Sequence, residues 1–111
     1  MVMLDTADWT ERRATARLPV RLDAKLFPGD RACEVKDFSL KGARVQLSDA
    51  SQSPDEVVLV LWASGQAFEA QAVWWNGDEI GLRFIRSCDL AQPVPLTFRE
   101  SKQAWQAARS A

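Results

Sequence analysis

Apolar and polar residues alternate through most of the chain. In residues 20–27, VRLDAKLF, every second side chain is apolar, which is the period of a strand that buries one face. Pro28, Gly29 and Asp30 follow directly and predict a turn. Further strands are predicted at RACEVKDF (31–38), GARVQL (42–47), EVVLVLW (56–62), QAFEAQAVWW (66–75) and EIGLRFI (79–85). The strand at 56–62 is apolar enough to be buried on both sides.

Turn signals separate these strands. The polar run at 48–56 predicts a connecting loop, and Ser64-Gly65 predicts a hairpin tip. Asn76-Gly77 predicts a type I′ hairpin, because that turn needs positive φ at both central positions. About six short strands in fewer than 70 residues, without a βαβ rhythm, predict an all-β fold, either an antiparallel sandwich or a small barrel.

The period changes after Pro93 and Pro95. The segment at 97–111, TFRESKQAWQAARSA, predicts one C-terminal helix. Thr97 and Glu100 have the spacing of a capping box. An apolar stripe is predicted from Phe98, Trp105 and Ala108. Such a stripe serves either to pack the helix on the sheet or to bind a partner.

Composition sets the class of protein. With 111 residues, of which 47% are hydrophobic and 26% charged, the chain fits one folded domain. No window approaches the ~20 apolar residues of a membrane span, and the first residues, MVMLD, lack the apolar run of a secretory signal. We therefore expect a cytoplasmic protein that does not insert into a membrane.

Several kinds of chemistry are disfavoured. The chain has no histidine or tyrosine, and general acid/base catalysis at neutral pH usually uses histidine or a carboxylate with a shifted pKa. We therefore expect that the protein is not an enzyme. Cys33 and Cys88 lie far apart without a CxxC pair, which predicts neither a metal site nor a disulfide. A formal net charge of −1 argues against sequence-blind binding of a nucleic acid polymer.

Two short motifs stand out against this background. Four arginines, Arg12, Arg13, Arg17 and Arg21, fall within ten positions, and they include the RxxxR spacing of R-A-T-A-R at 13–17. About twenty residues later comes D-F-S-L-K-G at 37–42, a [DN]xSxxG sequence. Together, in this order, the two motifs resemble the PilZ family, the bacterial receptors for the second messenger cyclic di-GMP. The closing AVWWNGDEIGLRF is similar to the last hairpin of that family, so the resemblance covers roughly residues 12–86.

The resemblance implies a fold and a division of the chain. The fold is a six-stranded antiparallel β-barrel, all-β apart from a C-terminal α-helix. Residues 1–11 are expected to be an N-terminal tail, 12–90 the barrel domain including an arginine loop, and 91–111 a helical segment. The resemblance also implies that Arg13 and Arg17 lie on a loop that folds over the ligand, and that no cofactor other than this ligand is needed.

The residue types suit the ligand. Arginine can form bidentate hydrogen bonds to phosphate or to guanine O6 and N7, and it can stack on a purine. Asp37 and Ser39 are two apart, so on a strand both side chains emerge from one face, where a carboxylate can accept from guanine N1–H and N2. Gly42 suits a positive φ or a close approach to the ligand. Alternatively, these three residues only shape a turn.

Other residues near the motifs remain secondary candidates. Arg12 precedes RxxxR, and we interpret its extra charge as a means of holding a stacked pair of ligand molecules. Lys41 and Arg44 flank the second motif, but solvent-facing strand charges are expected there, so neither joins the primary site. Of Trp74 and Trp75, at least one is expected to enter the core.

The predicted function is that of a cyclic di-GMP receptor that acts through an unidentified downstream protein, as a monomer or a homodimer. One alternative is a degenerate adaptor of the same fold that binds no nucleotide and acts only by protein contacts. Another is a small barrel that binds single-stranded nucleic acid, which would need aromatic and basic residues interleaved on a strand face. The strands here carry acids as often as bases, which disfavours that alternative.

Overall fold

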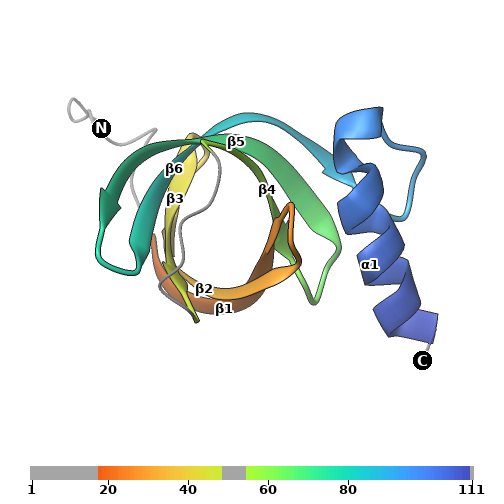
Figure 1. Ribbon diagram of the computed structural model, residues 1–111, viewed down its shortest axis with the longest axis horizontal. Coiled ribbons are helices and arrows are strands. Elements are labelled where there is room, and N and C mark those ends of the chain that lie inside the picture. The colour runs from red at the N-terminus through yellow and green to blue at the C-terminus, as the bar shows by residue number, and fades with distance from the viewer. Residues whose placement is uncertain (1–17, 49–54, 111) are drawn as a thin grey trace, which may run out of the picture.

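The computed structural model describes residues 18–48 and 55–110. Six strands form a closed barrel in the order β1-β2-β3-β6-β5-β4, and every pair of neighbours is antiparallel (Figure 1). A short 3₁₀ turn and one helix follow the last strand. The bounds are β1 Leu18–Phe27, β2 Arg31–Phe38, β3 Gly42–Leu47, β4 Glu56–Leu61, β5 Gln66–Asn76, β6 Glu79–Asp89, η2 Leu96–Phe98 and α1 Arg99–Ser110. The predicted six-stranded antiparallel barrel with a C-terminal helix is confirmed.

Side chains alternate between the inside and the outside of the barrel along each strand, and this divides the apolar residues between two cores. One core fills the barrel, with side chains from all six strands, among them Val35, Val45 and Ile80. The other lies between the outside of the barrel and the C-terminal segment, and it includes Phe98 and Trp105. Strand β4 contributes to both cores, which confirms that it is buried on both faces.

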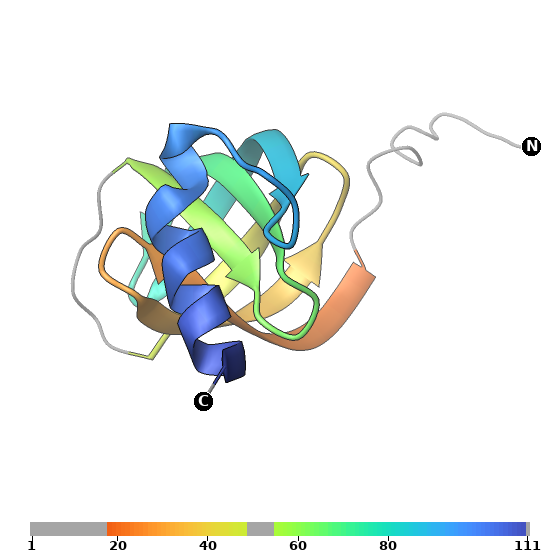
Figure 2. The ribbon, with the colours of Figure 1, turned by 90° about the vertical axis from the view of Figure 1, so that its right-hand side faces the viewer.

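The helix α1 packs on its own barrel, as Figure 2 shows. Trp105 is 6% exposed, and its indole Nε1 donates to the carbonyl oxygen of Trp62 at 3.1 Å. Its ring lies against Gly65, where a β-carbon would overlap the indole. Gly65 has φ +77°, so the tight turn after β4 both needs glycine and makes room for the helix. In the described residues, no helix is long and apolar enough to cross a membrane.

Two details of the helix prediction are wrong. Thr97 lies inside η2 and its hydroxyl accepts from Arg86, while the carboxylate of Glu100 accepts from the backbone N–H of Gly29, so the two do not form a capping box. Ala108 is exposed. The residue that joins Phe98 and Trp105 on the buried side is Ser101, whose hydroxyl donates to the carbonyl oxygen of Phe98 at 2.8 Å. A local hydrogen bond thus lets a polar side chain take a buried position.

The prediction for the tryptophan pair is also wrong. Trp74 and Trp75 are each 38% exposed, and neither enters the core. Strand β4 pairs with β5 only as far as Gln71, so the end of β5 has β6 as its neighbour among the described strands. A bulge between Ala72 and Trp74 also shifts the register there. The tryptophans therefore lie on a hairpin that extends past the barrel wall.

Candidate functional site

The start of β1 lies beside the end of β2. In the register of these strands Leu18 is opposite Phe38, and Pro19 is opposite Asp37. Arg12, Arg13 and Arg17, predicted to bind the ligand, lie outside the described residues. Because Arg17 directly precedes Leu18, the chain that carries the arginines joins the barrel beside the second motif.

Ser39 shapes the turn between β2 and β3. Its side chain is buried, and its Oγ accepts from the backbone N–H groups of Lys41 and Gly42, both at 3.2 Å. Its own N–H donates to the carbonyl oxygen of Gly42 at 2.8 Å. The turn-forming alternative therefore describes what Ser39 does in this structure, and its contact with a ligand stays a prediction.

Gly42 is required by a close approach of two strands. It pairs with Arg83 of β6, and a β-carbon at this position would overlap the backbone carbonyl oxygen of Leu82. Its φ is not in the positive range, in contrast to Gly29, Gly65 and Gly77. The positive φ suggested by the sequence is therefore wrong, the close approach to a ligand stays a prediction, and the close approach that the structure shows is to the backbone of β6.

Changing Gly42 to alanine is therefore expected to destabilise the barrel. The added methyl group must separate β3 from β6 at a backbone contact that cannot rotate away, and such overpacking costs about 1–3 kcal/mol of the free energy of unfolding. Urea denaturation of both proteins measures this. The control Lys41→Ala, at an exposed side chain in the same turn, should stay within about 0.5 kcal/mol of wild type. Equal midpoints for Gly42→Ala and wild type would contradict the assigned role.

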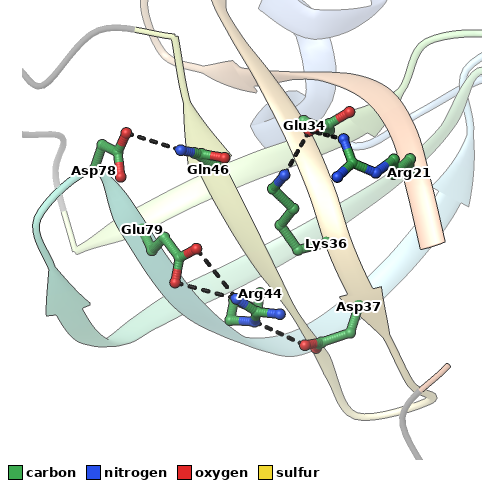
Figure 3. Close-up of polar contacts among 8 residues, drawn as sticks. All are labelled: Arg21, Glu34, Lys36, Asp37, Arg44, Gln46, Asp78 and Glu79. Carbon is green, nitrogen blue, oxygen red and sulfur yellow. Dashed lines mark hydrogen bonds and ion pairs between the residues drawn. The ribbon is translucent and has the colours of Figure 1, made fainter. Parts of the chain in front are cut away.

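Asp37 belongs to an ion-pair network on the outside of the barrel, which Figure 3 shows. The Nε of Arg44 in β3 donates to Oδ2 of Asp37 in β2 at 2.8 Å. Its Nη1 donates to both carboxylate oxygens of Glu79 in β6, at 3.2 and 3.1 Å. The hydrogen bond to Asp37, and then that to Glu79, raises the pKa of Arg44 above its ordinary value. We call these three residues the Asp37–Arg44–Glu79 network.

Arg44 was expected to be a solvent-facing strand charge, and it does lie on the outside of the barrel, but it is also paired with two acids. Its side chain is 37% exposed, and it lies between two carboxylates that are 14% and 27% exposed. Sequence reasoning missed Arg44 and Glu79 because they become neighbours of Asp37 only through strand register. Arg44 is opposite Asp37 on one side and Gly81 on the other, and Glu79 is two residues from Gly81.

The same face continues onto the last hairpin. Gly81 is opposite Arg44 in β3 and opposite Trp74 in β5. The indole of Trp74 lies across Gly81, where any side chain would overlap it. Two residues further along β6, on the same face, the guanidinium of Arg83 donates to the side chain of Gln71. The face thus offers a carboxylate, a guanidinium and an aromatic ring on four adjoining strands.

This arrangement is suited to binding a polar ligand. Within the described ranges, no group of histidine, cysteine, aspartate and glutamate side chains could hold a metal ion. Burial raises the pKa of Cys33 to about 12, so this thiol stays protonated at neutral pH and is not a nucleophile. A cavity of about 500 Å³ lies elsewhere, lined by Lys25, Trp62 and Asp78 among others, and none of the described motif residues 37–42 lines it.

Comparison with protein families identifies the domain. The family model for the PilZ domain matches residues 11–99, which include both motifs and all six strands. The chain belongs to the PilZ domain family. PilZ domains are receptor and adaptor domains of the cyclic di-GMP-binding type. No curated protein matches the sequence.

Proposed function

We propose that this PilZ domain is a receptor for cyclic di-GMP. The observation that carries the proposal is the pairing of Leu18 with Phe38. The next residue, Pro19, pairs with Asp37, so the start of β1, which directly follows the arginine segment, residues 12–17, in the sequence, lies beside the second motif. An extended chain spans at most about 3.3–3.6 Å per residue, so the Cα of Arg13 lies within about 18 Å of that of Leu18. Both arginines of RxxxR are therefore within reach of a ligand that lies on β2 and β3.

The ligand matches the charges on each side of this site. Cyclic di-GMP has two phosphates for the guanidinium groups of Arg13 and Arg17, each able to form a bidentate pair. Its guanines offer N1–H and N2–H donors to the carboxylate of Asp37. Ser39 and Gly42 contribute by holding the turn that positions this carboxylate, since the Ser39 Oγ is already used by the turn.

The output of such a receptor is an altered surface. Ligand binding would bring the arginine segment and the β2–β3 face together, and this acts as a switch where a partner binds the two states with different affinity. In this proposal the downstream protein binds the surface that the arginine segment and the β2–β3 face form together. A cytoplasmic location fits the proposal, because the nucleotide is an intracellular messenger in the family.

Calorimetric titration with cyclic di-GMP tests the proposal. Wild type should bind, and Asp37→Ala should bind about ten- to a hundredfold more weakly, the effect of losing a specific base contact. Asp55→Ala removes an exposed acid directly before β4 and should retain wild-type affinity. A linear RNA of matched charge should not compete. No heat of binding with wild type would reject the proposal and favour the degenerate adaptor.

The same titration gives the stoichiometry. If Arg12 adds charge for a stacked pair of ligand molecules, which together carry four phosphates, two molecules should bind per chain at saturation. The variant Arg12→Ala should then bind one molecule and retain the other contacts. Saturation of wild type at one molecule per chain would contradict this role of Arg12.

A further inference from the structure

We propose that Arg44 selects guanine over adenine by donating a hydrogen bond to the base whose N1–H and N2–H donate to Asp37. This inference rests on the proposed function, because it names a residue that gives the same site its specificity. It assigns Arg44 to the binding surface, where it contacts the base directly.

The guanidinium of Arg44 has one nitrogen in reserve. Its Nε is engaged by Asp37 and its Nη1 by Glu79. Within the described part of the chain, its third nitrogen, Nη2, forms no hydrogen bond. A guanidinium is planar, so Nε and Nη2 point along the same edge, and Nη2 lies on the side of Asp37 (Figure 3). A donor and a carboxylate are therefore side by side.

The guanidinium of Arg44 is held in place and remains partly exposed. The carboxylate of Glu79 contacts Nη1 with both of its oxygens and so limits rotation of the guanidinium. The Arg44 side chain is nevertheless 37% exposed, which leaves one edge open to a ligand. An arginine fixed between two acids loses less conformational freedom on binding than a free surface arginine would.

The order of donor and acceptors matches one base. Along its Watson–Crick edge guanine presents the O6 acceptor followed by the N1–H and N2–H donors. Arg44 Nη2 followed by the carboxylate of Asp37 presents a donor followed by acceptors. Adenine has the N6 amino donor in place of O6 and an acceptor at N1, so it would set donor against donor and acceptor against acceptor. Such unpaired polar groups are what makes a hydrogen-bonding site reject the wrong ligand.

A second role for Arg44 has to be separated from this one. If Arg44 only orients Asp37, its loss should weaken the contacts to both N1–H and N2–H, so cyclic di-GMP should lose more affinity than a ligand that lacks the N2 amino group. Cyclic di-IMP, whose base keeps O6 and N1–H and lacks the N2 amino group, is that ligand. Loss of a bond to O6 should instead weaken both ligands by the same factor, and cyclic di-AMP, which has neither O6 nor N1–H, should be spared in either case.

The test is calorimetry on the full chain with cyclic di-GMP, cyclic di-IMP and cyclic di-AMP. Arg44→Met should lose about ten- to a hundredfold in affinity for the first two ligands by equal factors, and should bind cyclic di-AMP no more weakly than wild type does. Arg44→Lys, which keeps a donor, should recover part of the loss. Arg21→Met removes a 77% exposed arginine of the same barrel and should change all three affinities by one common small factor.

The outcomes separate the two proposals. If wild type binds cyclic di-GMP and Arg44→Met keeps the wild-type preference for guanine over adenine, the role of Arg44 is wrong and the proposed receptor function stands. If wild type binds none of the three nucleotides, both are wrong. Thermal unfolding of each variant shows whether it is folded. If Arg44→Met does not fold, the same titrations are made with Arg44→Gln.

Discussion

Replacing both Arg13 and Arg17 with alanine is expected to weaken cyclic di-GMP binding by roughly 30-fold to 10⁴-fold. Each bidentate arginine contact contributes about 1–3 kcal/mol, and each 1.4 kcal/mol is about tenfold in affinity. The loss should exceed that of any single substitution on the barrel face, because in the proposed site the arginine segment supplies the cationic side and the barrel side includes the acids Asp37 and Glu79. Calorimetry or ligand-dependent tryptophan fluorescence measures it.

A matched control separates specific contacts from general charge. The double variant Arg99→Ala with Arg109→Ala removes the same formal charge from two exposed positions of α1, on the other side of the barrel from the candidate site. Long-range attraction is weak beyond a Debye length of about 8 Å at physiological salt, so this control should change affinity by less than about threefold. Equal losses in the two double variants would contradict the assignment of RxxxR to the site.

Replacing Trp105 with alanine is expected to cost about 3–5 kcal/mol of the free energy of unfolding, the usual effect of removing a large buried aromatic side chain. The indole fills the contact between α1 and the barrel, stacks against Gly65 and donates to Trp62. Its removal leaves a cavity between α1 and the barrel, and α1 is the only α-helix that packs there among the described residues. Urea denaturation followed by circular dichroism measures the change.

Two further variants make this result interpretable. Trp105→Phe keeps a ring and loses the hydrogen bond to Trp62, so it should cost less than Trp105→Ala and remain folded. Trp75→Ala, at a side chain that is 38% exposed, should cost less than half as much as Trp105→Ala. If Trp75→Ala were the more damaging of the two, the helix contact would not be the second core that the structure indicates.

The helix and the candidate site lie on different sides of the barrel (Figure 1). The residues under α1 come mainly from β4 and from the adjoining parts of β1 and β5, whereas the Asp37–Arg44–Glu79 network is on β2, β3 and β6. A folded Trp105→Phe protein should therefore bind cyclic di-GMP with wild-type affinity. We therefore expect that substitutions can change stability and ligand binding separately in this domain.

The strands were predictable because each has a local signal. A period of two residues and glycine-containing turns are readable without knowing which strands pair. The two-sided burial of β4 was readable in the same way, from a run without polar residues. The helix cap was not readable, because Thr97 and Glu100 are engaged by Arg86 and Gly29, which are distant in the sequence.

The candidate site was predictable only in part for the same reason. The turn role of Ser39 depends on backbone groups two and three residues away, so it could be stated as an alternative from the sequence. Arg44 was missed because its two partners are on different strands, and Glu79 is 35 residues away along the chain. Knowing which residues of β2, β3 and β6 pair would have identified Arg44 as the neighbour of both acids. That pairing could not be read from the sequence.

Chemical-shift mapping of ¹⁵N-labelled protein during titration with cyclic di-GMP tests most directly where the ligand binds. The largest changes are expected at the amides of residues 36–44 and of Gly81, with little change along α1. Changes centred on α1, or on the cavity beside Trp62, would contradict a site formed where the arginine segment meets the end of β2.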